Sequence, residues 1–188
     1  MARFDYFHTL SELSDIMEGE VAMAFDRSGH KGSETVSAGK KKASKLYADT
    51  QKALWEDMIP PLERRDIASV VNSLLRIINT AYELQTERSR ISAGIFSPPL
   101  RTSCDSNTRK KGEIYSEIAR EIGRTVALLG NIRRMKEPPS RYIYDLSLNI
   151  FEKASSPHGD RAAYLERKLG DDLSICYDRL VEVIYNNL

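Results

Sequence analysis

The sequence predicts an all-α protein, folded as an antiparallel bundle of about six helices. Three observations favour this fold class. Apolar residues recur every three or four positions along most of the chain, which is the spacing of one helix face. The 7 prolines and 10 glycines fall mostly between these periodic segments, where helices end. No stretch sustains the alternation of apolar and polar residues typical of a half-buried strand, so we expect no sheet.

The first two helices are expected over residues 3–26 and from about residue 39 to 58. The polar, glycine-containing segment 28–39 between them is expected to be a loop. The apolar stripe of the first helix includes Phe4, Phe7, Leu10, Met17 and Val21. The face of the second helix that is expected to pack against the core contains Leu46, Ala53, Leu54 and Trp55.

A third helix follows Pro60-Pro61. Proline fits the first turn of a helix, where its missing N–H is not needed, so we expect this pair in that turn. Glu63 comes next, at the positive end of the helix dipole. The helix is expected to continue to about Ser92. Its apolar face is wide enough to predict a central place in the bundle, with Ile67, Val70, Val71, Leu74, Ile77, Ile78, Ala81 and Leu84.

The remainder of the chain predicts three more helices. The fourth is expected over residues 109–136 and is broken by Pro138-Pro139. The fifth is expected over residues 140–154. Asp160 is a suitable N-cap for the last helix. The apolar stripe of that helix includes Leu165, Leu169, Leu173, Cys176 and Leu180.

Residues 94–108 are the best candidate for an internal boundary, because they combine two prolines with several polar residues. The chain would then be one domain over residues 1–188, with halves of three helices each at about 1–94 and 109–188. A chain of 188 residues can bury roughly two thirds of the surface that its unfolded form exposes. The core therefore needs neither a disulfide nor a metal.

Charge and hydropathy narrow the function class. The net charge of +1 gives no field for a nucleic-acid partner. Cys104 and Cys176 lack metal-ligand spacing and are expected to be reduced thiols. The longest uncharged apolar run, Ile67–Leu75, has nine residues, whereas a membrane-spanning helix needs about 20. The N-terminus also lacks the order of a signal peptide. We expect a cytoplasmic protein without an integral membrane segment.

The segment Met58–Ile67, MIPPLERRDI, resembles a signature of the PhoU-like family that accompanies Pit-type transporters of inorganic phosphate. Members of that family join their second and third helices by a similar run of proline, acidic residues, arginine and Asp-Ile. Residues 3–7 resemble the aromatic and acidic opening of the family. Residues 171–178 resemble its last-helix segment. The similarity extends over the whole chain in helix order, and Pro60–Ile67 is its most specific part.

The resemblance implies six helices as two three-helix bundles, a cytoplasmic location and a role in phosphate transport or signalling. The partner it implies is a membrane phosphate transporter or its cytoplasmic loops. PhoU proteins also bind clusters of iron or related metals through paired acidic residues. In this sequence the positions that match those acids are occupied by Ser44, Arg76, Asn79, Arg141 and Ser174. Because cations repel a metal and hydroxyls replace carboxylates poorly, we expect the cluster to be absent and no cofactor to be bound.

Lys40, Lys41 and Lys42 are a first candidate binding site. They open the second predicted helix, where cations oppose the helix dipole. They could contact phosphate, an anionic membrane surface or an acidic loop of a transporter. The alternative interpretation is an exposed, solvated helix start.

Arg64, Arg65 and Asp66 are a second candidate, for a partner or an anion. The alternative is a solvated first turn of helix with local ion pairs. Such pairs are common and stabilise a helix by roughly 0.3–0.5 kcal/mol each.

Asp171, Asp172 and Asp178 are the remaining candidate metal ligands, in a one-metal site completed by Glu18 or Glu20. Residues 171 and 178 lie two helical turns apart on one face. Glu18 and Glu20, two positions apart, point to different faces. A metal held by these residues therefore depends on one of the two glutamates facing α-helical residues 171 and 178.

The leading functional hypothesis is a non-enzymatic regulatory protein that modulates phosphate transport by binding another protein, with a homo-oligomer as a candidate assembly. A second hypothesis is a metal-dependent helical-bundle enzyme. It would require Glu83, Glu117, Asp172 and Asp178 to meet in space. A third is a structural oligomeric module unrelated to phosphate. No phosphate-binding glycine loop and no nucleophile motif occurs in the sequence.

Overall fold

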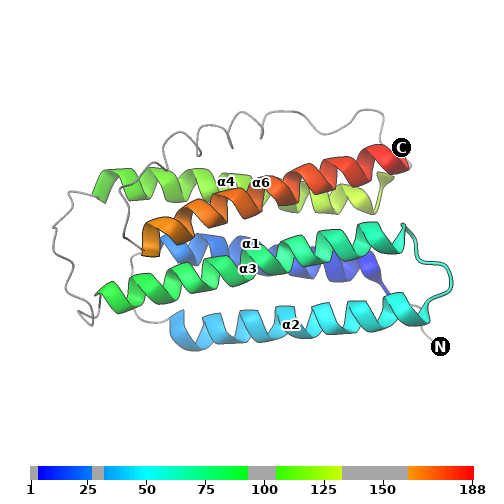
Figure 1. Cartoon of the computed structure of the whole chain (residues 1–188), viewed down its shortest axis with the longest axis horizontal. Coiled ribbons are helices and arrows are strands. Elements are labelled where there is room, and N and C mark those ends of the chain that lie inside the picture. The colour runs from blue at the N-terminus through cyan, green and yellow to red at the C-terminus, as the bar shows by residue number, and fades with distance from the viewer. Residues whose placement is uncertain (1–3, 27–31, 93–104, 133–160) are drawn as a thin grey trace.

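The computed structural model describes four parts of the chain, residues 4–26, 32–92, 105–132 and 161–188. These residues form five α-helices and no strand. In chain order the helices are α1 (Tyr6–Phe25), α2 (Gly32–Glu56), α3 (Arg64–Ser92), α4 (Asp105–Leu129) and α6 (Arg161–Asn187). The prediction of an all-α helical bundle is confirmed (Figure 1).

Some of the predictions concern residues outside the described ranges. They are the helix over residues 140–154, Arg141, Cys104 and most of the boundary at 94–108. The arrangement as two halves of three helices stays a prediction.

Two helices begin earlier than predicted. α2 starts at Gly32 rather than near residue 39, and α4 starts at Asp105 rather than at 109. The expectation of a loop over residues 28–39 is therefore wrong for its second part. Helix nucleation is costly and extension is cheap, so a helix nucleated on its apolar positions continues into a polar flank.

The start of α3 also differs from the expectation. α3 begins at Arg64, so Pro60-Pro61 precedes the helix instead of lying in its first turn. The carbonyl of Glu63 accepts the backbone N–H of Ile67 at 3.1 Å, which makes Glu63 the residue that caps the helix. The two prolines shape the connection between α2 and α3.

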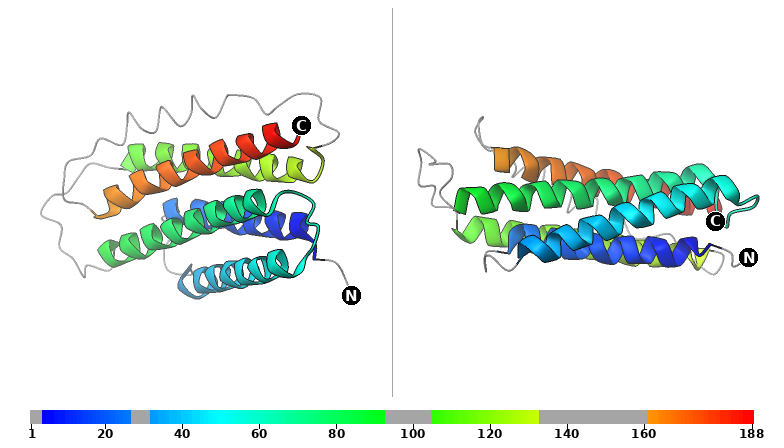
Figure 2. Two further views of the ribbon diagram at one scale, coloured as in Figure 1. Left: turned by 45° about the vertical axis from the view of Figure 1, so that its right-hand side comes forward. Right: turned by 90° about the horizontal axis from the view of Figure 1, so that it is seen from below.

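The helices pack in antiparallel and parallel pairs. α1 packs against α2, α3 and α4, and α6 packs against α3 and α4. α1 is antiparallel to α2 and α4, and α3 is antiparallel to α2 and α6, whereas α1 runs parallel to α3 and α4 runs parallel to α6 (Figures 1 and 2). Two contacts fix α1 against its neighbours. The Tyr6 hydroxyl donates to the carboxylate of Asp57, just after α2, at 2.7 Å, and Arg88 of α3 donates to the carbonyl of Ala24.

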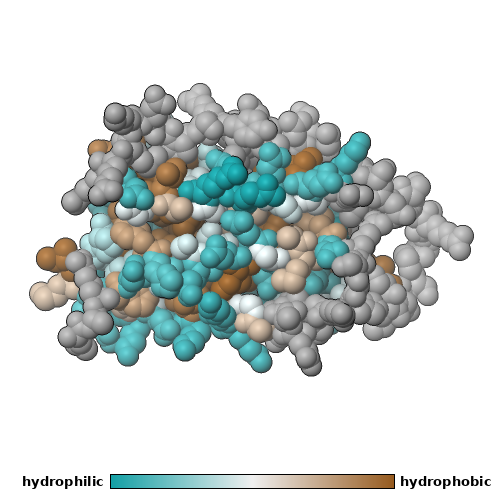
Figure 3. Space-filling view, turned by 180° about the vertical axis from the view of Figure 1, so that it is seen from behind, coloured by the Kyte–Doolittle hydropathy of each residue, from teal (hydrophilic) through white to brown (hydrophobic). Residues whose placement is uncertain are grey.

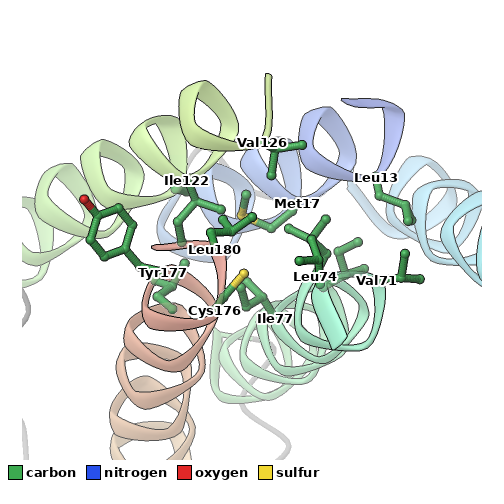
Figure 4. Packing of buried hydrophobic residues seen from close by; sticks show 14 of the residues in the cluster. Leu13, Met17, Val71, Leu74, Ile77, Ile122, Val126, Cys176, Tyr177 and Leu180 are labelled. Atoms are coloured by element: carbon green, nitrogen blue, oxygen red, sulfur yellow. The ribbon is translucent and has the colours of Figure 1, made fainter. Parts of the chain in front are cut away.

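One apolar cluster includes residues from all five described helices. α1 and α3 end before residue 94, and they pack against α4 and α6, which begin after residue 104. The described helices of both parts of the chain therefore share this core. Figure 4 shows Met17 and Leu180 meeting there, with side chains of α3 and α4 beside them. Cys176 is fully buried in the cluster as a free thiol, and burial raises its pKa to about 12.

α2 is the helix with the smallest share of this core. It lies along one side of the α1–α3 pair (Figure 1). Its buried residues are mostly small: Ala43, Thr50, Ala53 and Leu54. Because the stabilisation from burial scales with the apolar area removed from water, α2 gains less from packing than its neighbours.

Arg64 fixes the connection between α2 and α3. Its Nε donates to the carbonyl of Leu54 at 3.0 Å, and its guanidinium also donates to the carbonyls of Asp57 and Met58. The last carbonyls of a helix have no partner within the helix, so one cation at the start of α3 satisfies the end of α2.

We expect Arg64→Met to destabilise the protein by about 1–2 kcal/mol, because a part-buried hydrogen bond from a charged group to the Leu54 carbonyl and two exposed ones are lost. Urea unfolding followed by circular dichroism measures this change. Arg65→Met is the matched control, since Arg65 is exposed and should change the free energy of unfolding by no more than about 0.5 kcal/mol. Equal effects of the two substitutions would contradict this role of Arg64.

Candidate functional site

The three lysines of the first candidate site do not converge. Because α2 begins at Gly32, they lie two turns inside the helix rather than at its start. Lys40 places its Nζ 4.4 Å from the centroid of the Tyr82 ring, and Lys42 pairs with Glu12 at 3.3 Å. Lys41 is exposed. Consecutive helical residues point about 100° apart, which explains why the three do not form one cluster.

The second candidate site is divided between two structural roles. The guanidinium of Arg64 lies on the carbonyls at the end of α2. Asp66 accepts a hydrogen bond from the Asn187 side chain at 3.3 Å, so it joins α3 to the end of α6. Arg65 remains exposed beside them.

The three candidate metal ligands of α6 also point to different surroundings. Asp172 is 3% exposed and accepts hydrogen bonds from Arg76 Nε at 2.6 Å and from the Thr80 hydroxyl at 2.7 Å. Asp171 is half-buried, and desolvation raises its pKa against the field of Arg167. Asp178 is exposed on α6. Asp172, the most deeply buried of the three carboxylates, is thus already paired with a cation, Arg76.

The four acids required by the enzyme hypothesis do not meet. Glu83 and Glu117 are exposed, while Asp172 is turned onto Arg76. Within the described ranges, no three acidic, histidine or cysteine side chains lie close enough to hold one metal ion.

A second buried ionic cluster was not predicted from the sequence. Glu166 of α6 pairs with Arg88 of α3 and with Lys111 of α4 at 3.3 Å. The Tyr115 hydroxyl donates to the carbonyl of Glu166 at 2.9 Å, and Arg88 also lies 4.5 Å from the centroid of the Phe25 ring. Four helices meet at this cluster. The sequence feature that could have indicated this cluster is the position of Arg88, one turn after Leu84 on the apolar face of α3.

Glu20, which the sequence suggested only as a metal ligand, is instead a buried polar residue at the α1–α2 contact. It is 1% exposed between α1 and α2, and its Oε2 has no hydrogen-bond partner among the described residues. Desolvation raises its pKa to about 7, and Lys40 acts in the opposite direction. The signal in the sequence was its place three residues after Met17 and next to Val21, on the buried stripe of α1.

Large apolar side chains are exposed where α2 joins α3. Trp55 is 88%, Met58 90% and Ile59 79% exposed, and we call these three residues the apolar corner. A brown group of side chains projects from this end of the molecule (Figure 3). The exposed Tyr185 and Leu188 lie at the same end. The prediction that Trp55 faces the core is wrong, because Ala53 and Leu54 take the inward positions and Trp55 follows on the outer side.

No described helix is both long and apolar enough to cross a membrane. The chain matches no protein-family model and no curated protein.

We expect Arg76→Met to destabilise the fold by about 1–3 kcal/mol, because it leaves the Asp172 carboxylate buried without a cation. Arg76 is half exposed, so the loss should stay below that of a fully buried pair. Asp172→Asn removes the charge, and the double substitution should cost less than the sum of the single ones. Urea unfolding of the four proteins measures the coupling, and strictly additive effects would contradict it.

Proposed function

We propose that this protein is a non-enzymatic regulatory protein that modulates inorganic phosphate transport by binding the cytoplasmic loops of a membrane transporter. The resemblance of Met58–Ile67 to the PhoU-like family suggests the process and the partner. Under this proposal the chain is cytoplasmic and adopts the family's arrangement of three plus three helices. The experiments below test the partner and the mode of binding.

The exposure of the apolar corner is the observation that carries the proposal. Three large apolar side chains stand beside each other in water, although burying each would be favourable. Tryptophan and methionine are enriched in protein–protein interfaces, and tryptophan often dominates their binding energy. The corner lies in and beside the segment that resembles the family signature. A partner that covered Trp55 and Met58 would remove this apolar surface from water.

The corner is also held in shape before any partner binds. Arg64 bonds to carbonyls of Leu54, Asp57 and Met58, and the Tyr6 hydroxyl holds the Asp57 side chain. A preformed surface loses less conformational freedom on association, so more of the contact energy appears as affinity.

Charged residues of both signs surround the corner. Lys52 and Glu56 form an exposed pair at 3.8 Å, and Glu63 and Arg65 are exposed on the other side. An apolar centre with a mixed polar rim is typical of a protein-binding surface. An anionic membrane would instead favour an excess of lysine and arginine.

The buried acids support a binding role over a catalytic one. The Asp172 carboxylate is neutralised by Arg76 and accepts a hydrogen bond from the Thr80 hydroxyl, and the Glu166 carboxylate is neutralised by Arg88 and Lys111. Carboxylates that are held by cations in a core are poorly placed to bind substrate or activate water. The enzyme hypothesis is therefore the weaker alternative, and a structural oligomer remains an outcome of the binding experiment.

We expect Trp55 to report binding directly, because it is the single tryptophan of the chain. Adding nanodiscs that contain a Pit-type transporter from the source organism should shift its fluorescence to shorter wavelength and saturate. Trp55→Ser and Met58→Ser, measured by interferometry on immobilised nanodiscs, should each weaken binding about 30-fold. Tyr164→Ser is the matched control, since Tyr164 is exposed at the start of α6 and should leave affinity unchanged.

Three results would overturn the proposal. Absence of binding would exclude the transporter as partner. An equal shift with empty nanodiscs would show that lipid covers the corner. A shift that follows protein concentration alone would identify a second copy of the chain as the occupant and favour the structural oligomer.

We expect the purified protein to carry less than one equivalent of iron, nickel or zinc, because Arg76 occupies a position that matches a metal-binding acid of the family. Elemental analysis after purification without chelators measures this content. Loading with several metal ions per chain would contradict the proposed absence of a cofactor.

A further inference from the structure

Two buried oxygens at the junction of α1, α2 and α3 lack hydrogen-bond donors. They are Oε2 of Glu20 and Oε1 of Gln85, and neither has a partner among the described residues. A polar atom buried without a hydrogen bond is destabilising, and an ionised carboxylate more so. A protonated carboxyl, however, is a donor as well as an acceptor.

The helix register places these oxygens at the same level of the bundle. Gly39 of α2 lies against the Glu20 carboxylate, and Lys40 lies over Tyr82 of α3. One turn further along, Arg88 of α3 contacts the carbonyl of Ala24 of α1. Gln85 lies between Tyr82 and Arg88 on α3, and Glu20 lies one turn before Ala24 on α1. A proton on Glu20 would give this junction the donor that it lacks.

The charged groups near Glu20 do not pair with it. On α2, Lys40 is the cation whose field acts on the carboxyl, but its ammonium lies on the Tyr82 ring. On α3, the guanidinium of Arg88 is bonded to Glu166 and to the Ala24 carbonyl. On α1 itself, no described residue perturbs the carboxyl. Ionised Glu20 would therefore be a buried anion without a hydrogen-bonded cation.

Gly39 makes this contact possible. A Cβ atom at residue 39 would collide with Oε1 of Glu20, so α2 approaches α1 closely here because glycine has no side chain. α2 is otherwise held by few large apolar residues. The seating of this part of α2 thus depends on the state of one carboxyl group.

We infer that Glu20 is a pH-dependent switch that seats α2 on the bundle. In the neutral state, Glu20 donates to Gln85 and Gly39 packs against it. When Glu20 ionises, the carboxylate draws Lys40 from the Tyr82 ring and admits water, and the first half of α2 loosens from α1 and α3. This inference stands apart from the proposed partner, since it concerns the opposite half of α2.

The electrostatics support the same direction. Burial raises the pKa of Glu20 from 4.5 to about 7. The folded protein thus holds a proton that the unfolded chain releases at lower pH. The stabilisation is complete below pH 4.5, declines as the pH rises, and is lost above pH 7.

A carboxyl titration tests the switch directly. In the intact protein with ¹³C-labelled glutamate, one side-chain carboxyl should titrate near pH 7, and its resonance should be missing in Glu20→Gln. Lys40→Met should raise that midpoint, because it removes the cation that favours ionisation. If every glutamate of the folded wild-type protein titrated below pH 6, the inference would be overturned, whatever the variants do.

Thermal unfolding provides the second measurement. The melting temperature of the wild-type protein should fall by about 3–5 °C per pH unit between pH 4.5 and pH 7 and level off above pH 7, where both states have lost the proton. Hydrogen exchange in the first half of α2 should become faster over the same range, after correction for the intrinsic rate. Glu20→Gln should remove this dependence. Asp15→Asn, on the exposed side of the same helix, should keep it. A wild-type slope retained in Glu20→Gln would contradict the switch.

Discussion

Two ion pairs across the interior join α3 to α6 and set how these helices meet. Arg76 pairs with Asp172, and Arg88 pairs with Glu166 three turns further along. Apolar packing alone is non-directional, and a slide by one turn would leave much of it intact. The same slide would leave the Asp172 and Glu166 carboxylates buried without their cations, which is far more costly. The antiparallel register of α3 and α6 therefore depends on these pairs.

The other central helices are tied to the same framework. Lys111 and Tyr115 bring α4 to Glu166, and the carbonyl of Ala24 brings α1 to Arg88. α2 has no described contact with either ion pair. It is held by small buried residues, by the Arg64 connection and by the junction around Glu20. The structure thus combines four mutually braced helices with a fifth that can be released at lower free-energy cost.

The spacing of apolar residues along the sequence predicted which face of most helices is buried. The stripes of α1, α3 and α6 placed their cores correctly, because helical period and burial are coupled at every turn. Trp55 was wrongly assigned to the core. An apolar residue at the end of a stripe can face either the core or the solvent, and the sequence pattern does not distinguish the two. The pair Arg76–Asp172 spans 96 positions and leaves no local signal. Glu20 was considered only as a metal ligand, because its place on the apolar stripe does not reveal whether a hydrogen-bond donor lies opposite it in the core.

α2 carries the Glu20 contact near one end and the apolar corner at the other. From Gly39 to Trp55 the helix spans about 24 Å at a rise of 1.5 Å per residue. A stiff rod of this length turns a small tilt at one end into a displacement at the other. If protonation changes the affinity of the corner for a partner by some factor, then the partner must change the proton affinity of Glu20 by the same factor. The helix would then exchange protons with the solution each time its far end is occupied or released.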